Sequence, residues 1–418
     1  MGRLKRIDNT AHNRIASCNA PAGAMGKWMP LKIFIYCQHV WGVGHLYRIR
    51  EICRVLAQHE LVLVTGGPAV TLSMPPNVRH FRLPALRMDA RGQLYADDGR
   101  PLEEVWPERI ARLLGLFSAE PPDAFLIEFF PLGRNAFKRE LVPILSALRE
   151  GRLPPCRVYC SVRDILVEKR DPASFEKRAA ASLNRWFDAL LVHADPSFIK
   201  LDATFARLDT IDIPIIYTGF VAQPRASRKA RARLRQQIGA RPDDDVIVVS
   251  AGGGQSGFPL LQAMLSAQDT MRNKRNVRLA VFTGPYLPAE QRAILQKLAG
   301  PDTIIQDFSH DFRGWLEAAD VSVSMAGYNT CMNLLAAKVP ALVWPFEGDR
   351  EQPLRAKKLA EGGWLTVLKK TDLEPGRLAA RIDQTLTAGA TPNSGIDLQG
   401  AQKTARLIET QHARNRRS

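Results

Sequence analysis

Residues 31–45 read LKIFIYCQHVWGVGH and residues 246–257 read VIVVSAGGGQSG, and these two stretches decide the expected fold. Each begins as an apolar strand and passes through a glycine-bearing turn into a helix, the second of which opens FPLLQAML. Such a turn directs the unpaired N–H groups of a helix N-terminus toward one point, where they can hold phosphate without side-chain charge. The pair predicts two facing halves with a phosphorylated ligand between them.

Length and charge narrow the class of protein. A chain of 418 residues is long enough for two or three domains. No apolar run approaches the ~18–20 residues that span a bilayer. The net charge of +16 favours anionic partners such as a nucleotide or an anionic membrane face. Aromatic residues are sparse at 7% and no nucleic-acid motif accompanies the charge, so we expect no nucleic-acid partner.

The cysteines and the N-terminal stretch give information on the cellular location of the protein. The six cysteines are scattered, which suits a reducing cytoplasm better than a disulfide framework. Cys156 and Cys160 lack the second pair of ligands that a structural zinc site needs. Residues 1–30 hold no apolar signal segment, and we expect them to be a disordered extension. The predicted location is the cytoplasm, with peripheral contact at the inner membrane left open.

Strand-like and helix-like segments alternate from residue 31 onward, which predicts parallel, doubly wound sheets. We therefore expect an α/β protein with two Rossmann-like domains whose parallel sheets face each other across a cleft. The expected parts are an N-terminal domain over residues 31–219, a basic linker over 220–243, a C-terminal domain over 244–399, and a C-terminal helix with a basic tail over 400–418.

Two charged segments near the expected linker have more than one interpretation. Residues 225–235 (RASRKARARLR) hold six Arg or Lys and no acid, which fits a solvated linker or surface helix, or a patch that docks on an anionic membrane. Asp243 and Asp245 form a D-x-D pattern, which is suggestive of metal-assisted sugar transfer. They precede a strand, however, whereas ligands of parallel sheets gather at the strands' carboxyl ends. We expect a turn there and no metal site.

Residues 321–355 (VSVSMAGYNTCMNLLAAKVPALVWPFEGDREQPLR) form the richest segment. A buried strand is expected to end at Met325, followed by a turn at Gly327. Thr330 is the predicted N-cap of the next helix, because its hydroxyl can accept a backbone N–H two or three residues on. Pro340 ends that helix. The helix start and the loop FEGDREQP predict a polar pocket at the carboxyl edge of the sheet.

This segment resembles the nucleotide-sugar signature of the MurG-type inverting glycosyltransferases. Further motifs resemble the bacterial "predicted glycosyltransferase" relatives of that enzyme, and they follow in order across residues 31–370. They are YCQHVWGVGHLYR, EFFPLGR, SVRDIL, YTGFV and SAGGGQSG. The resemblance implies a GT-B fold that transfers a hexosyl or N-acetylhexosaminyl group from a UDP-linked sugar. The acceptor, a glycan, lipid-linked sugar or small metabolite, would bind mainly to the N-terminal domain. No metal or other cofactor is implied, because helix N-termini and basic groups would stabilise the leaving diphosphate.

The resemblance also assigns site residues by position. The diphosphate would lie against the glycine turn and the helix start, with the ribose and the donor sugar beyond. The implied donor-binding residues are Gly252, Gly253, Gly254, Gln255, Ser256, Gly327, Tyr328, Asn329, Thr330, Asn333, Asp349 and Gln352. The expected acceptor-binding residues are His39, Gly42, Gly44, Arg134 and Arg163.

Two positions depart from the family pattern. The family usually has glutamate where this chain has Asn333, and glutamate can take both ribose hydroxyls in charge-assisted hydrogen bonds. The change predicts a loss of roughly 1–2 kcal/mol of donor binding. The pattern also has paired glutamines where this chain has Glu351 and Gln352, so the identity of the donor sugar does not transfer.

Sugar transfer needs a base that takes the proton of the acceptor hydroxyl. His45 is the leading candidate and matches the histidine of the family's Gly-His pair; capping the helix or binding an acceptor phosphate are its alternatives. Glu128 and Asp164 each follow an apolar strand and are further candidates, as base or as the group that orients it. Structural ion pairs, Glu128 with Arg134 and Arg163 with Asp164, are the competing interpretation.

Two other functions fit the same residues. A nucleotide-sugar epimerase would use the same pocket without an acceptor. A non-catalytic protein that binds nucleotide sugars or polyanions is the other alternative, because Asn333 weakens the expected ribose site and the chain is strongly basic.

Overall fold

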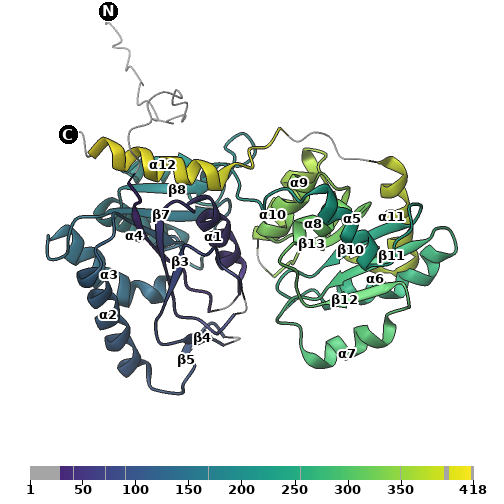
Figure 1. Ribbon diagram of the computed structural model, residues 1–418, viewed down its shortest axis with the longest axis horizontal. Helices are drawn as coiled ribbons and strands as arrows, with labels where there is room; N and C mark the ends of the chain where they lie inside the picture. The colour runs from purple at the N-terminus through teal and green to yellow at the C-terminus, as the bar shows by residue number, and fades with distance from the viewer. Residues whose placement is uncertain are drawn as a thin grey trace, which may run out of the picture.

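The protein is described by a computed structural model over residues 29–40, 42–70, 72–89, 91–167, 169–254, 256–348, 350–389 and 395–415. Two α/β domains lie side by side (Figure 1). The predicted extension over residues 1–30 falls almost wholly outside the described residues.

The N-terminal domain is built on a seven-stranded parallel sheet in the order β3-β2-β1-β6-β7-β8-β9. Its central strands read as continuous apolar runs because helices cover both faces. The strands are β1 (Lys32–Tyr36), β2 (Glu60–Thr65), β3 (Val78–Arg82), β6 (Ala124–Glu128), β7 (Arg157–Arg163), β8 (Ala189–His193) and β9 (Ile215–Tyr217). The helices are α1 (Gly44–Val55), α2 (Leu102–Ala119), α3 (Lys138–Arg149) and α4 (Pro172–Trp186), and β4 (Leu86–Met88) pairs with β5 (Leu94–Ala96) as a separate hairpin.

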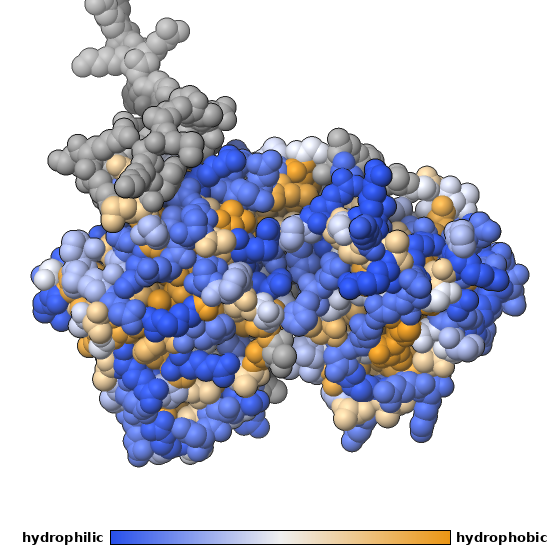
Figure 2. Space-filling view, in the orientation of Figure 1, coloured by the Kyte–Doolittle hydropathy of each residue, from blue (hydrophilic) through white to orange (hydrophobic). Residues whose placement is uncertain are grey.

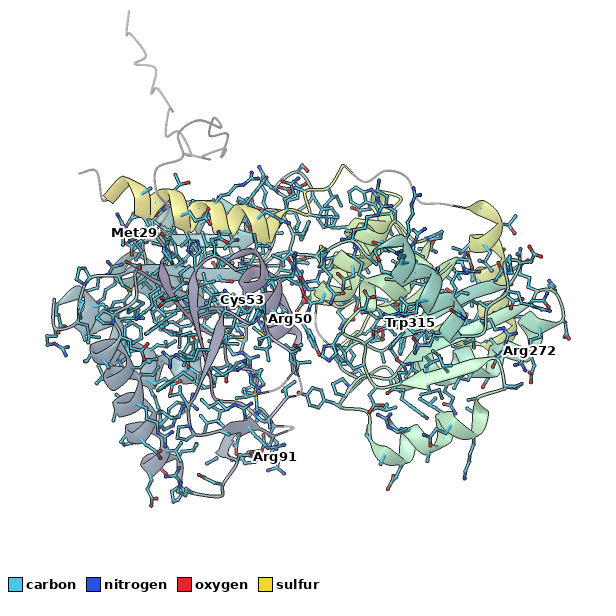
Figure 3. All side chains as sticks on the ribbon, in the orientation of Figure 1. Met29, Arg50, Cys53, Arg91, Arg272 and Trp315 are labelled. Carbon is cyan, nitrogen blue, oxygen red and sulfur yellow. The ribbon has the colours of Figure 1, made fainter. Side chains whose placement is uncertain are left out.

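The C-terminal domain repeats the plan with a six-stranded parallel sheet in the order β12-β11-β10-β13-β14-β15. Its strands are β10 (Asp245–Ser250), β11 (Val277–Phe282), β12 (Thr303–Gln306), β13 (Val321–Met325), β14 (Ala341–Trp344) and β15 (Thr366–Val367). Its helices are α5 (Arg228–Gln237), α6 (Phe258–Arg272), α7 (Ala289–Leu298), α8 (Phe312–Ala318), α9 (Tyr328–Ala337), α10 (Glu351–Glu361) and α11 (Pro375–Ala388). Cys53 and Trp315, labelled in Figure 3, lie in the buried cores of the first and second domain. The predicted fold class, two Rossmann-like domains with parallel sheets, is confirmed.

The basic segment over residues 220–243 is not a linker along its whole length. Its helix α5 packs against α8 of the C-terminal domain and buries Leu234 and Ile238. The Arg235 guanidinium donates to the carbonyl oxygens of Ala318 at 3.0 Å and Asp244 at 2.7 Å. The charged residues therefore form the outer face of a domain helix, and the crossing between the domains is confined to the residues before it.

The last helix returns to the first domain. Helix α12 (Gly400–Asn415) lies across the N-terminal domain (Figure 1) and buries Ala401, Ala405 and Ile408 against it. Tyr159 Oη donates to Gln411 Oε1 at 3.3 Å. The predicted C-terminal helix is thus a structural part of the N-terminal domain.

The two crossings pair with each other at a hinge. Phe220 N–H donates to Asp397 O at 2.8 Å, and Gly400 N–H donates to Phe220 O at 2.9 Å. Gly219 has a φ of 83°, and a Cβ atom there would lie 2.5 Å from Asp397 Cγ, so only glycine fits. No helix among the described residues is both long enough and apolar enough to span a bilayer.

Candidate active site between the two domains

A cleft with a volume of about 1120 Å³ lies between the carboxyl ends of the two sheets. In the space-filling view the domains touch along their upper part and separate toward the lower edge (Figure 2). Predicted residues from both domains line it: Gly42, Gly44, His45, Arg134 and Arg163 from the first, and Gly252, Gly253, Gly327, Tyr328, Asn329, Thr330, Asn333 and Gln352 from the second. The cleft therefore gathers most of the predicted site residues.

A histidine–carboxylate pair lies at the N-terminal wall of the cleft. His45 is in the first turn of α1, and its Nδ1 lies 2.7 Å from Glu128 Oε1 at the end of β6. Ser161 Oγ donates to the other carboxylate oxygen at 2.7 Å, and the Arg48 guanidinium donates to Oε1. Arg48 was not singled out from the sequence, although its i,i+3 spacing from His45 places both on one helix face.

The charges of this pair follow from burial and from Arg48. Burial would raise the pKa of Glu128, but the Arg48 guanidinium and the hydrogen bonds of His45 and Ser161 lower it to about 2. Burial lowers the pKa of His45 to about 3, against the opposite effect of Glu128. At neutral pH a neutral imidazole therefore donates its Nδ1 proton to a carboxylate, which can only accept, and Nε2 keeps a free lone pair.

The hydrogen bonds continue from Glu128 to the hinge. His193 is fully buried, and its Nε2 lies 2.9 Å from Ser161 Oγ. Its Nδ1 lies 2.8 Å from Thr218 Oγ1, one residue before the hinge glycine. Because Ser161 donates to Glu128, His193 Nε2 donates to Ser161 and Nδ1 accepts from Thr218. Burial, then Arg48, lowers the pKa of His193 to about 3.

Asp164 is placed differently from its prediction as a candidate base. It is fully buried, is not among the residues that line the cleft, and accepts two hydrogen bonds from Arg355 of α10, at 2.7 and 2.8 Å. Arg163 pairs instead with Glu351 at 2.5 Å. Among the described residues, neither Glu128 with Arg134 nor Arg163 with Asp164 forms an ion pair. The burial and pairing of Asp164 correct the expectation that it reaches the substrate.

Tyr328 lies at the junction of the domains. Its ring centroid is 5.2 Å from the guanidinium carbon of Arg48 and 5.5 Å from that of Arg355. Its hydroxyl donates to His193 O at 2.9 Å and accepts from Val221 N–H at 3.1 Å. The side chain therefore joins the domains, and only the backbone of Tyr328 can belong to a phosphate site.

Helix α9 begins earlier than predicted. Gly327 is the N-cap, so Thr330 lies in the first turn and does not cap it. Gly327 has an extended backbone and lines the cleft, so the helix starts next to it. The N–H groups of this first turn have no acceptors within the helix. The Asn329 side-chain amide donates to Gly44 O at 2.8 Å and so contacts the start of α1.

The glycine turn after β10 divides into two parts. Gly252 (φ 63°) and Gly253 line the cleft, although the Gly252 N–H donates to Ser250 Oγ at 3.2 Å. A methyl group at Gly254 would lie 2.6 Å from Thr283 O, so this glycine packs against a neighbouring loop. Ser256 is not among the residues that line the cleft. Gln255 and Asp349 lie outside the described residues.

The predicted ribose and sugar residues have intramolecular partners. Asn333 Oδ1 accepts the backbone N–H of Gln223 at 3.0 Å, which ties α9 to the segment that follows the hinge. Gln352 Oε1 accepts the backbone N–H of Phe346 at 3.1 Å. Gln223 was not foreseen, because no sequence spacing relates it to Asn333.

The acceptor side of the cleft is basic. Arg134 lines it and, within the part of the chain that the structure describes, has no carboxylate partner; burial, then Arg163, lowers its pKa. Lys169 and Arg91 also line the cleft, and Arg91 lies at its open end (Figure 3). His39 lies elsewhere, in a pocket of about 230 Å³, where its Nε2 is 2.8 Å from Pro68 O. The described residues include no group of three His, Cys, Asp or Glu side chains suited to a metal ion.

The C-terminal half of the chain is similar in sequence to known proteins. Residues 246–411 match the glycosyltransferase family 28 C-terminal domain. The UDP-N-acetylglucosamine--N-acetylmuramyl-(pentapeptide) pyrophosphoryl-undecaprenol N-acetylglucosamine transferase of Bacillus licheniformis is 28% identical over 177 residues, which are 41% of this chain and 47% of that protein. That of Bacillus subtilis is 24% identical over 175 residues, 41% of this chain and 47% of that protein. The chain thus spans about half the length of the curated relatives it matches.

Solved structures extend the likeness to both domains. The glycotransferase of kitacinnamycin aligns with a TM-score of 0.56 at 17% identity, over 92% of this chain and 96% of that chain. MurG of Acinetobacter baumannii aligns with a TM-score of 0.54 at 14% identity, over 91% of this chain and 100% of that chain. The chain therefore has the GT-B fold of the MurG-type glycosyltransferases, and its second half matches the C-terminal domain of glycosyltransferase family 28.

Proposed function

We propose that the protein is a glycosyltransferase that moves a hexosyl or N-acetylhexosaminyl group from a UDP-linked sugar to an acceptor hydroxyl, with inversion and without a bound metal. One observation carries the proposal. His45, held from behind by Glu128, lines the same cleft as the first turn of α9, so a base from one domain and a row of helix amides from the other face the same space.

The donor diphosphate would lie against the amides at the start of α9 and the open side of Gly252 and Gly253. Helix N-terminal amides and the partial positive charge of the helix dipole suit a diphosphate. In such a pose the developing negative charge of the leaving group would be stabilised by groups already in place before the reaction.

His45 would act as the base. Its Nε2 would take the proton of the acceptor hydroxyl while that oxygen bonds to the anomeric carbon, and the bond from the anomeric carbon to the diphosphate oxygen breaks on the opposite side. Glu128 holds the imidazole in the tautomer with a free Nε2 and stabilises the imidazolium that forms. Attack from the side opposite the leaving group would invert the anomeric centre.

The acceptor would carry negative charge and reach the cleft from the side of Arg134, Lys169 and Arg91. The curated relatives are named as transferases to a pyrophosphoryl-undecaprenol acceptor, and a lipid-linked phosphate would suit this basic wall. We accordingly place the protein in the cytoplasm with peripheral contact at the inner membrane. The chain's net charge of +16 supports attraction to an anionic membrane surface.

The test combines binding and turnover. The purified protein is screened by thermal shift against UDP, other nucleoside diphosphates and a panel of sugar nucleotides, and release of UDP is then measured with and without lipid-linked and soluble acceptors. Release that depends on an acceptor supports transfer. Conversion of the sugar nucleotide without an acceptor would indicate an epimerase, and stabilisation by UDP without any turnover would indicate a binding protein.

A further inference from the structure

A second cavity, of about 590 Å³, lies at the hinge, near the start of α12. Both domains and both crossings contribute to it. Arg54 and Gln402 come from α1 and α12, Arg313 comes from α8, and Lys338 follows α9. The crossings contribute residues 222–225, Gly395, Ile396 and Leu398. We refer to it as the hinge pocket. Its walls come from both domains, so a ligand held there would contact both of them at once.

Positive charge dominates the hinge pocket. Four of its described lining residues are cationic, namely Arg54, Arg225, Arg313 and Lys338, and none is Asp or Glu. Two of the cations have carboxylate partners that do not line it: Arg54 bonds to Glu51 at 3.1 Å and Arg313 to Glu317 at 2.9 Å.

Arg225 is a cation of the hinge pocket whose charge is not balanced by a nearby carboxylate among the described residues. It is exposed and, among the described residues, pairs with no carboxylate. Burial, then the neighbouring Arg225, lowers the pKa of Arg313, which indicates that the two guanidinium groups repel each other. An anion between them would replace that repulsion with two attractive contacts.

Gln223 connects this cavity to the cleft, since it lines both. Its side-chain oxygen accepts the backbone N–H of Arg313 at 3.0 Å, and its carbonyl oxygen accepts from the Arg313 guanidinium. Its own N–H donates to Asn333 in the cleft at 3.0 Å. A group bound to Arg313 is thus connected to the cleft through Arg313 and its hydrogen-bonded neighbour Gln223.

We propose that the hinge pocket binds a small phosphate-bearing anion. It would bridge the two domains by contacting Arg54 of α1 on one side and Arg225, Arg313 and Lys338 on the other. Phosphate is the anion chemistry that best fits several converging guanidinium and ammonium groups, because its oxygens accept several charge-assisted hydrogen bonds at once. The phosphate belongs either to a soluble metabolite or to a lipid headgroup, and the two sources are separable by experiment.

The experiment compares the full-length protein with two double variants that each remove two positive charges. Arg225→Gln/Lys338→Gln alters the hinge pocket, whereas Arg228→Gln/Lys229→Gln removes charges from the exposed start of α5, outside it. Equilibrium dialysis with labelled inorganic pyrophosphate at constant ionic strength gives the number of sites and their affinity. Sedimentation with phosphatidylcholine vesicles that contain phosphatidylglycerol gives binding to lipid phosphate.

We expect the hinge variant to lose one equivalent of bound pyrophosphate, or at least tenfold in its affinity, while the α5 variant matches the wild type. Counting equivalents separates this site from any binding in the cleft, because the cleft is intact in both variants. A loss confined to the vesicle assay would assign the phosphate to a lipid headgroup. Equal behaviour of the two variants in both assays would overturn the proposal, whether both bind normally or both lose binding by the same amount.

Discussion

Arg355 and Asp164 join the two domains through a bidentate ion pair, with N–O distances of 2.7 and 2.8 Å. Neither side chain has any exposed surface. Arg355 also donates to Glu351 at 2.8 Å and lies over the ring of Tyr328. The relative position of the domains, on which the cleft depends, is therefore fixed in part by directional polar contacts. Directional contacts specify one arrangement more narrowly than apolar packing alone.

Replacing Arg355 by Met should destabilise the protein strongly. The variant leaves the Asp164 carboxylate buried without a cationic partner, since only the Ile165 N–H still donates to it. Breaking such a pair from one side costs about 3–5 kcal/mol of unfolding free energy. Urea unfolding measures the effect, with Lys357→Met as the control because Lys357 is on the same helix with 74% of its side chain exposed. Adding Asp164→Asn to Arg355→Met should restore part of the loss. Equal urea midpoints for Arg355→Met and Lys357→Met would contradict this account.

The sequence predicted the central strands well, for a physical reason. Strands buried on both faces are continuous apolar runs, and the expected strands at residues 31–37 and 246–250 agree with β1 and β10 to within a residue at either end. Strand β3 was not predicted. It is the edge of its sheet, and its sequence VRHFR is mostly exposed and polar, so it carries no such run.

Only those site residues whose positions follow from a local sequence pattern could be predicted. His45, Glu128 and the glycine turns lie at ends of strands and starts of helices, where sequence position implies placement. Arg355 lies 191 residues from Asp164, and no spacing links them. The same holds for Gln223 and Asn333, whose hydrogen bond spans 110 residues. Partners that meet only after both domains have folded leave no signal in a single sequence.

Removing the proposed base should separate chemistry from binding. We expect His45→Ala to lower transfer about 10²–10⁴-fold while UDP still binds with unchanged affinity, because the donor contacts lie on the other domain. Glu128→Gln should lower turnover as well, since a neutral amide no longer stabilises the imidazolium. His39→Gln is the control, because His39 is buried outside the cleft. Undiminished turnover in His45→Ala would remove it from the role of base.

His193 should make the protein less stable in acid. Its pKa is about 3 in the folded protein, below the ordinary value of 6.5, so between these pH values the unfolded chain binds one more proton. The free energy of unfolding should therefore fall as the pH falls through this window, by about 1.4 kcal/mol per pH unit for this residue. His45 acts in the same direction. In urea unfolding between about pH 4 and pH 6, His193→Asn should show a shallower dependence; an unchanged slope would show that another group sets it.

Asn333 offers a test of the ribose site. Asn333→Glu should tighten UDP binding by about tenfold, since a carboxylate can accept both ribose hydroxyls in charge-assisted hydrogen bonds. Asn333→Ala should instead cost about 1–2 kcal/mol of stability, because the partly buried Gln223 N–H loses its acceptor. Calorimetric titration with UDP and urea unfolding measure the two effects. Unchanged affinity in Asn333→Glu would mean that the ribose lies elsewhere.

The adjacent glycines after β10 should respond differently to the same added methyl group. Gly254→Ala should destabilise the fold by about 1–3 kcal/mol, because the residue has a φ of 97° and the methyl group would lie 2.6 Å from Thr283 O. Gly253→Ala meets only an ordinary contact, 3.9 Å from Tyr286 Cδ2, so its stability should match the wild type. Because Gly253 lines the cleft, its methyl group would occupy space proposed for the diphosphate and weaken UDP binding at least tenfold. Thermal unfolding and UDP titration of both variants separate the effects, and full UDP affinity in Gly253→Ala would place the diphosphate away from this turn.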